Sequence, residues 1–192
     1  MALICEAPVL LGDTGPFCRF AETKALVCLQ HYLASNLMIV REVEVELRFR
    51  SMQPQHRELA PFAKGERPFV AFEAIDLDEA TLRQVTILAE RWRDRAVARG
   101  RARRGERANY GEIATVLAAV ERGVPVLMDD GEGKTLAQAR RLTVHTTEDL
   151  LAEMVAATVI KTRLAFLVYS KVYGSDRDAF DAAVADARVR GA

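Results

Sequence analysis

The residues with the clearest chemical potential are acidic side chains that follow short apolar runs. Asp13 comes after the first such run, and the adjacent pair Asp129 and Asp130 ends the run 124–128. Glu112 lies in the first turn of an expected helix just before that second run. In an open α/β sheet, the carboxyl ends of parallel strands meet at the edge where ligands bind. The sequence therefore predicts that several carboxylates share one edge of a sheet.

Carboxylates that converge on one cleft repel one another and raise one another's pKa values. A hard divalent cation relieves this repulsion, and Mg²⁺ or Mn²⁺ takes oxygen ligands while keeping several waters. One such water can attack a phosphodiester while the metal stabilises charge on the phosphoryl oxygens. Each acid also has an ordinary structural explanation. Asp13 suits a helix N-cap, and Glu112 suits the positive end of a helix dipole.

Composition describes an ordinary globular protein. The chain has 192 residues, of which 50% are hydrophobic and 28% are charged, so we expect a single domain spanning residues 1–192. The formal net charge is zero, and any nucleic-acid surface must therefore be local. The three cysteines form no CxxC pair and are expected as free thiols in a reducing cytoplasm. No apolar stretch is long enough for a membrane span, which predicts a cytoplasmic protein without membrane contact.

The elements that must position the acids follow from the alternation of short apolar runs with helical patterns. This alternation predicts an α/β fold whose mostly parallel sheet carries helices on both faces. The expected strands are 8–11, 36–40, 69–75, 124–128 and 142–146. The expected helices are 17–33, 79–95 with Asp76 or Asp78 as its cap, 110–120, 134–141, 147–168 with Thr147 as its cap, and 176–188. The proline-rich stretch 51–68 is expected to be an irregular connection.

The segment 41–49 fits two structures. Its alternation of charged and apolar residues suits a strand that continues 36–40. Its position after that strand, and its glutamates, equally suit the start of a helix. We favour the helix, partly because of the family resemblance given below. Glu42, Glu44 and Glu46 are weak functional signals when taken singly, because such residues usually form a solvated face.

Residues 91–107 form the main compositional break, with eight arginines and two glycines. Such a charge run is commonly a solvated face or a mobile loop. Alternatively, it grips RNA, because the planar guanidinium pairs with phosphate oxygens. The candidate RNA contacts are Arg91, Arg95, Arg99, Arg101, Arg103, Arg104 and Arg107. The stretch alone does not separate RNA from an acidic protein partner.

Four motifs, in this order and spacing, resemble those of PIN-domain proteins, the nuclease fold of toxin ribonucleases from bacterial and archaeal toxin–antitoxin pairs. The motifs are Asp13-Thr14-Gly15-Pro16, Val45-Glu46-Leu47, Gly111-Glu112-Ile113-Ala114 and Val126-Leu127-Met128-Asp129-Asp130 with the helical segment behind it. The resemblance covers most of the chain, from about residue 10 to 151. It implies a PIN-like three-layer αβα sandwich with a short, mostly parallel sheet. An arginine-rich insertion or loop (91–108) would precede the fourth strand, and C-terminal helices would fill 147–192.

The same resemblance implies an activity, that of a Mg²⁺- or Mn²⁺-dependent endoribonuclease. Its catalytic and metal-binding residues would be Asp13, Glu46, Glu112 and Asp130. Glu44 is an alternative to Glu46 and Asp129 to Asp130, while Thr14 and Lys134 are secondary candidates. The implied partners are RNA, a cognate antitoxin and a second copy of the chain. The alternative is a non-catalytic PIN-like module in which the acids are caps and the arginine segment docks nucleic acid or a protein.

Overall fold

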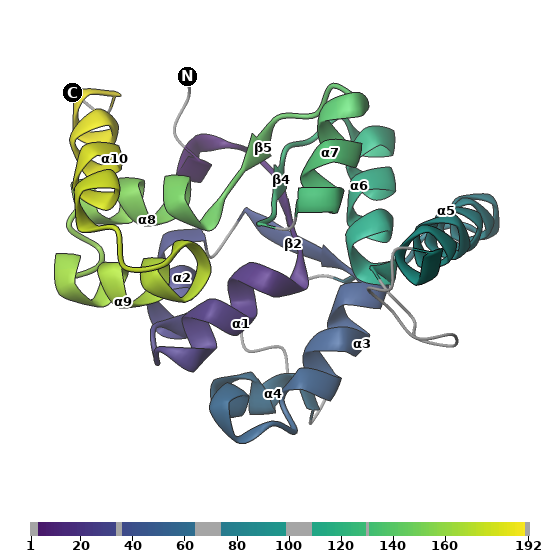
Figure 1. Cartoon of the computed structure of the whole chain (residues 1–192), viewed down its shortest axis with the longest axis horizontal. Helices are drawn as coiled ribbons and strands as arrows, with labels where there is room; N and C mark the ends of the chain where they lie inside the picture. Colours follow the sequence, from purple (N-terminus) through teal and green to yellow (C-terminus); the bar gives the residue numbers. More distant parts are fainter. Residues whose placement is uncertain (1–3, 34–35, 64–73, 99–108, 130, 191–192) are drawn as a thin grey trace.

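The computed structural model describes residues 4–33, 36–63, 74–98, 109–129 and 131–190. A sheet of parallel strands in the order β3-β2-β1-β4-β5 forms its centre (Figure 1). The strands are β1 (Leu10–Gly12), β2 (Leu37–Val40), β3 (Ala74–Ile75), β4 (Val126–Leu127) and β5 (Val144–His145). The prediction of an α/β fold with a short parallel sheet is confirmed. The strand expected at 69–75 is described only at Ala74–Ile75, and its remainder lies outside the described residues.

Strand β1 lies at the centre and pairs with β2 on one side and β4 on the other. Leu11 faces Met38 of β2 and Val126 of β4 in the register of the sheet. The strand order therefore reverses at β1, which is the point where open α/β sheets form a crevice beyond their carboxyl ends. The backbone N–H of Asp13 donates to the carbonyl of Leu127 over 3.0 Å. The residues after β1 consequently lie beside those after β4.

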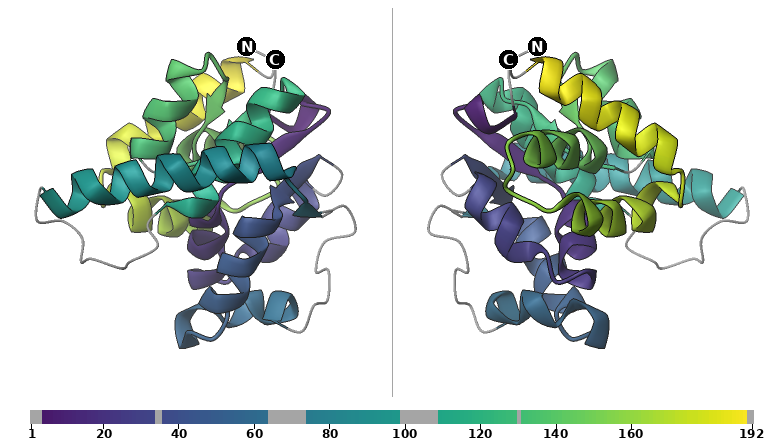
Figure 2. Two further views of the ribbon diagram at one scale, coloured as in Figure 1. Left: turned by 90° about the vertical axis from the view of Figure 1, so that its right-hand side faces the viewer. Right: turned by 90° about the vertical axis from the view of Figure 1, so that its left-hand side faces the viewer.

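Helices lie on both sides of the strands. Figure 1 shows α6 and α7 on one side and α2 and α8 on the other, and Figure 2 gives two side views. The helices are α1 (Thr14–Glu22), α2 (Leu26–Leu33), α3 (Arg41–Arg50), α4 (Ala60–Ala63), α5 (Glu79–Ala98), α6 (Tyr110–Arg122), α7 (Gly131–Ala139), α8 (Thr147–Ala156), α9 (Thr162–Tyr173) and α10 (Arg177–Arg190), with 3-10 segments η1 (Ile4–Glu6) and η2 (Pro54–Leu59). Helix α6 packs on β1, β2 and β4, and α8 packs on α9 and α10. In the described part of the chain, no helix has the length and apolar character that a membrane span requires.

The apolar faces of these helices meet the sheet in one core. Phe17 and Phe20 of α1, Leu29 of α2 and Phe180 of α10 are fully buried there. In α10 the buried residues Phe180, Val184 and Ala187 lie three or four positions apart, as expected for a helix packed on one face. Helix α6 is instead buried at every position from Ile113 to Ala119, and Val120, near its end, is 40% exposed.

The segment 41–49 forms helix α3, so the helical prediction is confirmed. Val43 and Leu47, one helical turn apart, are buried, whereas Val45 and Phe49 are 58% and 68% exposed. The alternation in the sequence therefore does not match a buried strand face. It arises because two of the four apolar residues face water.

One predicted helix, 147–168, is wrong, because the structure has two helices there, α8 and α9. The chain turns at Thr158, whose φ of 59° is left-handed and interrupts helical hydrogen bonding. The cap of α8 is Thr146 rather than Thr147. Thr146 and Asp149 form a capping box in which each side chain binds the other residue's backbone N–H.

Other boundaries also differ from the sequence predictions. The helix expected at 17–33 starts at Thr14 and is split into α1 and α2 near Lys24, which has a φ of 57°. The stretch 51–68 is not wholly irregular, since η2 and α4 occupy 54–63. The helix expected at 134–141 is α7, which begins at Gly131 and ends at Ala139. Residues 91–98 belong to α5 rather than to a loop.

Candidate functional site at the carboxyl ends of the central strands

Asp13 occupies the carboxyl end of β1 and caps α1. Its Oδ2 accepts the backbone N–H of Gly15 at 3.4 Å, and its backbone is extended, as an N-cap requires. The side chain is only 3% exposed. The capping role expected from the sequence is therefore present, and it places a buried carboxylate at the point where the strand order reverses.

Glu46 joins three helices at this edge. Its Oε2 accepts the hydroxyl of Thr14 at 2.6 Å, and its Oε1 accepts the backbone N–H of Gly111 at 3.0 Å. The carboxylate therefore holds the starts of α1 and α6 against α3. A Cβ atom at position 111 would lie 2.8 Å from Glu46 Oε1, so the carboxylate keeps this position only beside glycine and would have to move for a larger residue.

Glu112 follows Gly111 in the first turn of α6 and is half-buried. Its carboxylate lies against α7, since a Cβ atom at Gly133 would be 3.4 Å from Glu112 Oε2. The same Cβ position is 3.2 Å from the sulfur of Met128, the residue after β4. Glu46 thus links Thr14 and Gly111 by hydrogen bonds, and Glu112 and Met128 both lie beside Gly133.

Asp129 points to the C-terminal helices. Its Oδ1 accepts the backbone N–H of Thr147 at 2.8 Å and the hydroxyl of Tyr173 at 2.9 Å. Its Oδ2 accepts the hydroxyl of Thr147 at 2.7 Å. Burial and the charge of Asp129 raise the pKa of Tyr173, which keeps the phenol protonated as a donor. Asp130, the fourth residue of the predicted set, lies outside the described residues.

The sequence did not single out Tyr173, and it treated Thr147 only as a cap. Tyr173 lies 44 residues beyond Asp129, and no local motif links the two. Their contact depends on the packing of α9 against α8, which the hydrophobic pattern alone does not specify.

Glu44 is held by arginines of its own helix. It pairs with Arg41 and, at 2.6 Å, with Arg48. The carboxylate of Glu44 therefore binds arginines, and it takes no part in the hydrogen bonds that Glu46 makes with Thr14 and Gly111. Glu42, one turn before Glu46, has a buried Oε2 with no hydrogen-bond partner in the described part of the chain. Burial raises the pKa of Glu42, and the charges of Asp76 and Glu46 add to the effect.

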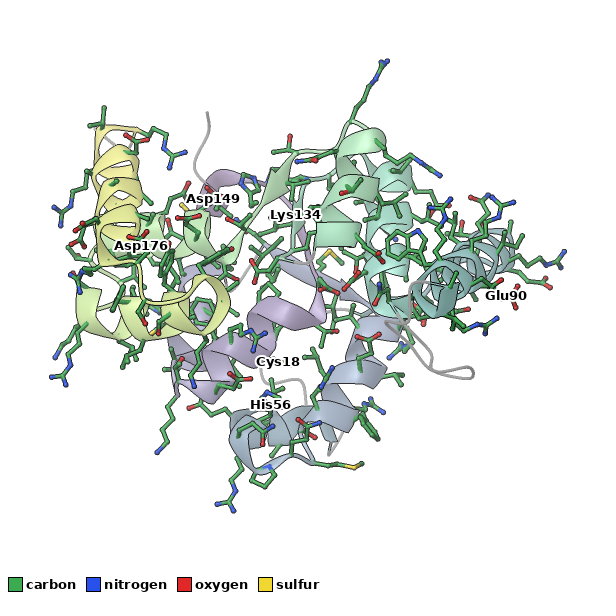
Figure 3. The ribbon with its side chains drawn as sticks, viewed as in Figure 1. Cys18, His56, Glu90, Lys134, Asp149 and Asp176 are labelled. Atoms are coloured by element: carbon green, nitrogen blue, oxygen red, sulfur yellow. The ribbon has the colours of Figure 1, made fainter. Side chains whose placement is uncertain are left out.

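The candidate RNA contacts fall into two groups. Arg91 and Arg95 lie on α5 and are exposed, and no residue from Glu90 to the end of that helix is buried. The others, Arg99, Arg101, Arg103, Arg104 and Arg107, lie outside the described residues. Figure 3 shows Glu90 on α5 at the right-hand side of the molecule, with Lys134 nearer its centre on α7. Lys134 is partly exposed in the first turns of α7, close in sequence to the end of β4.

The donor chemistry of the edge suits a hard divalent cation, because Asp13, Glu46 and Glu112 offer carboxylate oxygens. Among the described residues, however, no three Asp, Glu, His or Cys side chains lie close enough together to hold a metal ion. The described side chains alone therefore do not form a metal site, and Asp130, the remaining residue of the predicted set, lies outside them.

The fold and this edge define the chain as an α/β protein with a parallel sheet and acidic groups at its switch point. Comparison with family models, with curated proteins and with solved structures gives no match. Any inference about function therefore depends on the chemistry of the edge itself.

Proposed function

We propose that this chain is a PIN-like endoribonuclease that depends on Mg²⁺ or Mn²⁺. The observation that carries the proposal is the position of Glu46, hydrogen-bonded to Thr14 and to Gly111. These two bonds bring acids from three separate motifs, Asp13, Glu46 and Glu112, to one edge of the sheet. The strand order, which reverses at β1, supports the same proposal because ligands bind at such points.

In this proposal Asp13, Glu46, Glu112 and Asp130 would hold the metal ion. When bound, the metal supplies an activated water and stabilises charge on the phosphoryl oxygens. Thr14 and the backbone of Gly111 orient Glu46. Arginines of α5 and of the following segment bind the RNA backbone through charge-assisted hydrogen bonds. The proposal includes RNA as the substrate, a cognate antitoxin and a second copy as partners, and a cytoplasmic location.

The test is cleavage of structured RNAs by the purified chain with Mn²⁺, with and without EDTA. Glu46→Gln removes a charge that the metal needs, and we expect it to reduce cleavage by about 100-fold or more. Glu44→Gln is the matched control on the same helix and is expected to retain cleavage, because Glu44 pairs with Arg41 and Arg48. Cleavage that survives EDTA, or that survives Asp13→Asn combined with Asp130→Asn, contradicts the proposal.

A second candidate function is a non-catalytic module that binds nucleic acid or a protein. It is favoured by the absence of any three-residue metal group among the described side chains and by the capping role of Asp13. In that case the chain binds RNA in Mn²⁺ without cutting it, and Asp13→Asn leaves the affinity for RNA unchanged. Cleavage that disappears in Asp13→Asn rules this candidate out.

A further inference from the structure

We propose that Asp129 is a positioning residue rather than a metal ligand. Thr147 and Tyr173 fix its side chain, and the end of β4 is thereby kept in place beside the carboxylates of the acidic edge. The inference rests on the proposed function. It gives a role in that function to helices α8 and α9, which the four motifs do not include. It also assigns one role to Asp129, which the sequence leaves as an alternative metal ligand.

The hydrogen bonds of Asp129 are those of a structural anchor. Oδ1 already accepts two donors, the N–H of Thr147 and the hydroxyl of Tyr173, and Oδ2 accepts the hydroxyl of Thr147. A carboxylate oxygen has about two acceptor positions, so those of Oδ1 are filled, whereas, among the described residues, Oδ2 and each oxygen of Glu46 accept a single bond. Thr147 is 0% exposed, and hydrogen bonds to an ionised acceptor are roughly twice as strong as neutral ones.

The anchor connects directly to the acidic edge. Met128, next to Asp129, donates its N–H to the carbonyl of His145 at 2.9 Å, which continues the pairing of β4 with β5. One residue earlier, Leu127 accepts the N–H of Asp13 at 3.0 Å. The side chains of Met128 and Glu112 both lie beside Gly133, at 3.2 Å and 3.4 Å from the position of a Cβ atom there. A shift of the end of β4 would therefore disturb Asp13 through its bond to Leu127, and would move Met128 relative to Gly133, which Glu112 also approaches.

Asparagine at position 129 separates the two roles. Its amide oxygen can keep both bonds of Oδ1, and its amide nitrogen can donate to the hydroxyl oxygen of Thr147, which also accepts. Asp129→Asn therefore preserves the anchor while removing the charge that a ligand needs. Asp129→Ala removes all three bonds together with the charge. A positioning residue is rescued by asparagine, and a ligand is not.

The experiment titrates the full chain with Mn²⁺ alone and measures the affinity for Mn²⁺ by isothermal titration calorimetry. Loss of a group that orients metal ligands typically weakens affinity by about 10- to 100-fold. We expect that loss for Asp129→Ala and for Tyr173→Phe, and a change of less than about threefold for Asp129→Asn. The matched control is Tyr32→Phe, which removes a tyrosine hydroxyl that donates to another carboxylate, Glu153, at 3.5 Å. Asp13→Asn gives the reference for loss of a ligand.

Each outcome decides a different point. An affinity in Asp129→Asn as low as in Asp13→Asn identifies Asp129 as a ligand and overturns the inference. Wild-type affinity in both Tyr173→Phe and Asp129→Ala shows that the anchor positions nothing. If Asp129→Ala does not fold, Thr147→Val removes one bond with little change of shape and takes its place. A wild-type chain that binds no Mn²⁺ overturns the proposed function as well, a result distinct from the other two.

Discussion

Gly111→Ala is the substitution that tests the candidate site most directly. The new Cβ atom would lie 2.8 Å from Oε1, 2.9 Å from Cδ and 3.0 Å from Oε2 of Glu46. The first two distances are shorter than real Cβ contacts and the third is tighter than most of them, so the carboxylate must move. When it moves, it weakens its bonds to the hydroxyl of Thr14 and to the N–H at position 111. The backbone at 111 is helical, so the substitution introduces no strain of its own.

The expected effect on activity is larger than the effect on stability. Loss of one hydrogen bond to a charged group costs about 1.5–3 kcal/mol, while alanine in a helix recovers about 1 kcal/mol relative to glycine. The free energy of unfolding should therefore fall by about 0.5–2 kcal/mol. A displacement of about 1 Å in a catalytic group lowers the rate by about 100-fold, which corresponds to about 2.7 kcal/mol in the barrier.

The assay compares kcat/KM for RNA cleavage in Mn²⁺ with urea unfolding of the same variants. Gly131→Ala is the matched control, because a Cβ atom there meets nothing within 4 Å. Thr14→Val removes the other bond of Glu46 without adding bulk at 111, and it should also reduce cleavage. Full activity in both Gly111→Ala and Thr14→Val would refute the reasoning that the position of Glu46 controls the site.

Three further predictions concern pH, a helix end and RNA. Burial raises the pKa of Glu153 above 4.5, so the folded state holds its proton more tightly and the wild-type free energy of unfolding should fall as pH rises from about 4.5. Urea unfolding at several pH values should show that Glu153→Gln lacks this fall in the free energy of unfolding. If the free energies of the variant and the wild type differ by the same amount at every pH, the prediction is wrong. Gly123 ends α6 with a φ of 65° and open space at its Cβ position, so Gly123→Ala should lower the free energy of unfolding by about 1 kcal/mol through backbone strain; no shift in the urea midpoint contradicts this. Arg91→Ala with Arg95→Ala should make the slope of log affinity for single-stranded RNA against log salt less negative by about 1.4, and an unchanged slope excludes both as phosphate contacts.

The sheet could be predicted from the sequence because its signals are local. Each short apolar run is followed by a turn or a helix signal, and parallel pairing then follows from the alternation of strands and helices. Helix α3 was harder, since Val45 and Phe49 are apolar but exposed. Its position after β2 and the resemblance of Val45-Glu46-Leu47 indicated the helix, whereas its periodicity did not.

The errors have a common physical cause, which is that tertiary packing overrides local pattern. Apolar residues continue from α8 into α9 without glycine or proline, and nothing in the sequence marks Thr158 as left-handed. The hydrogen-bond partners of Asp129 could not be predicted either. The partners of Asp129 come from Thr147 and Tyr173, and their approach depends on how α8 and α9 pack.

Helix α5 has two parts with different support. Its buried residues, Thr81, Val85 and Ala89, all lie in the first eleven of its 20 positions, and Figure 2 shows the helix extending past the rest of the molecule. Backbone bonds without buried apolar support open at low free energy. Amide hydrogen exchange should therefore be slow in α5 as far as about Ala89 and fast in the rest of the helix. The arginines of the outer turns can thus change direction while the sheet and its acidic edge stay fixed.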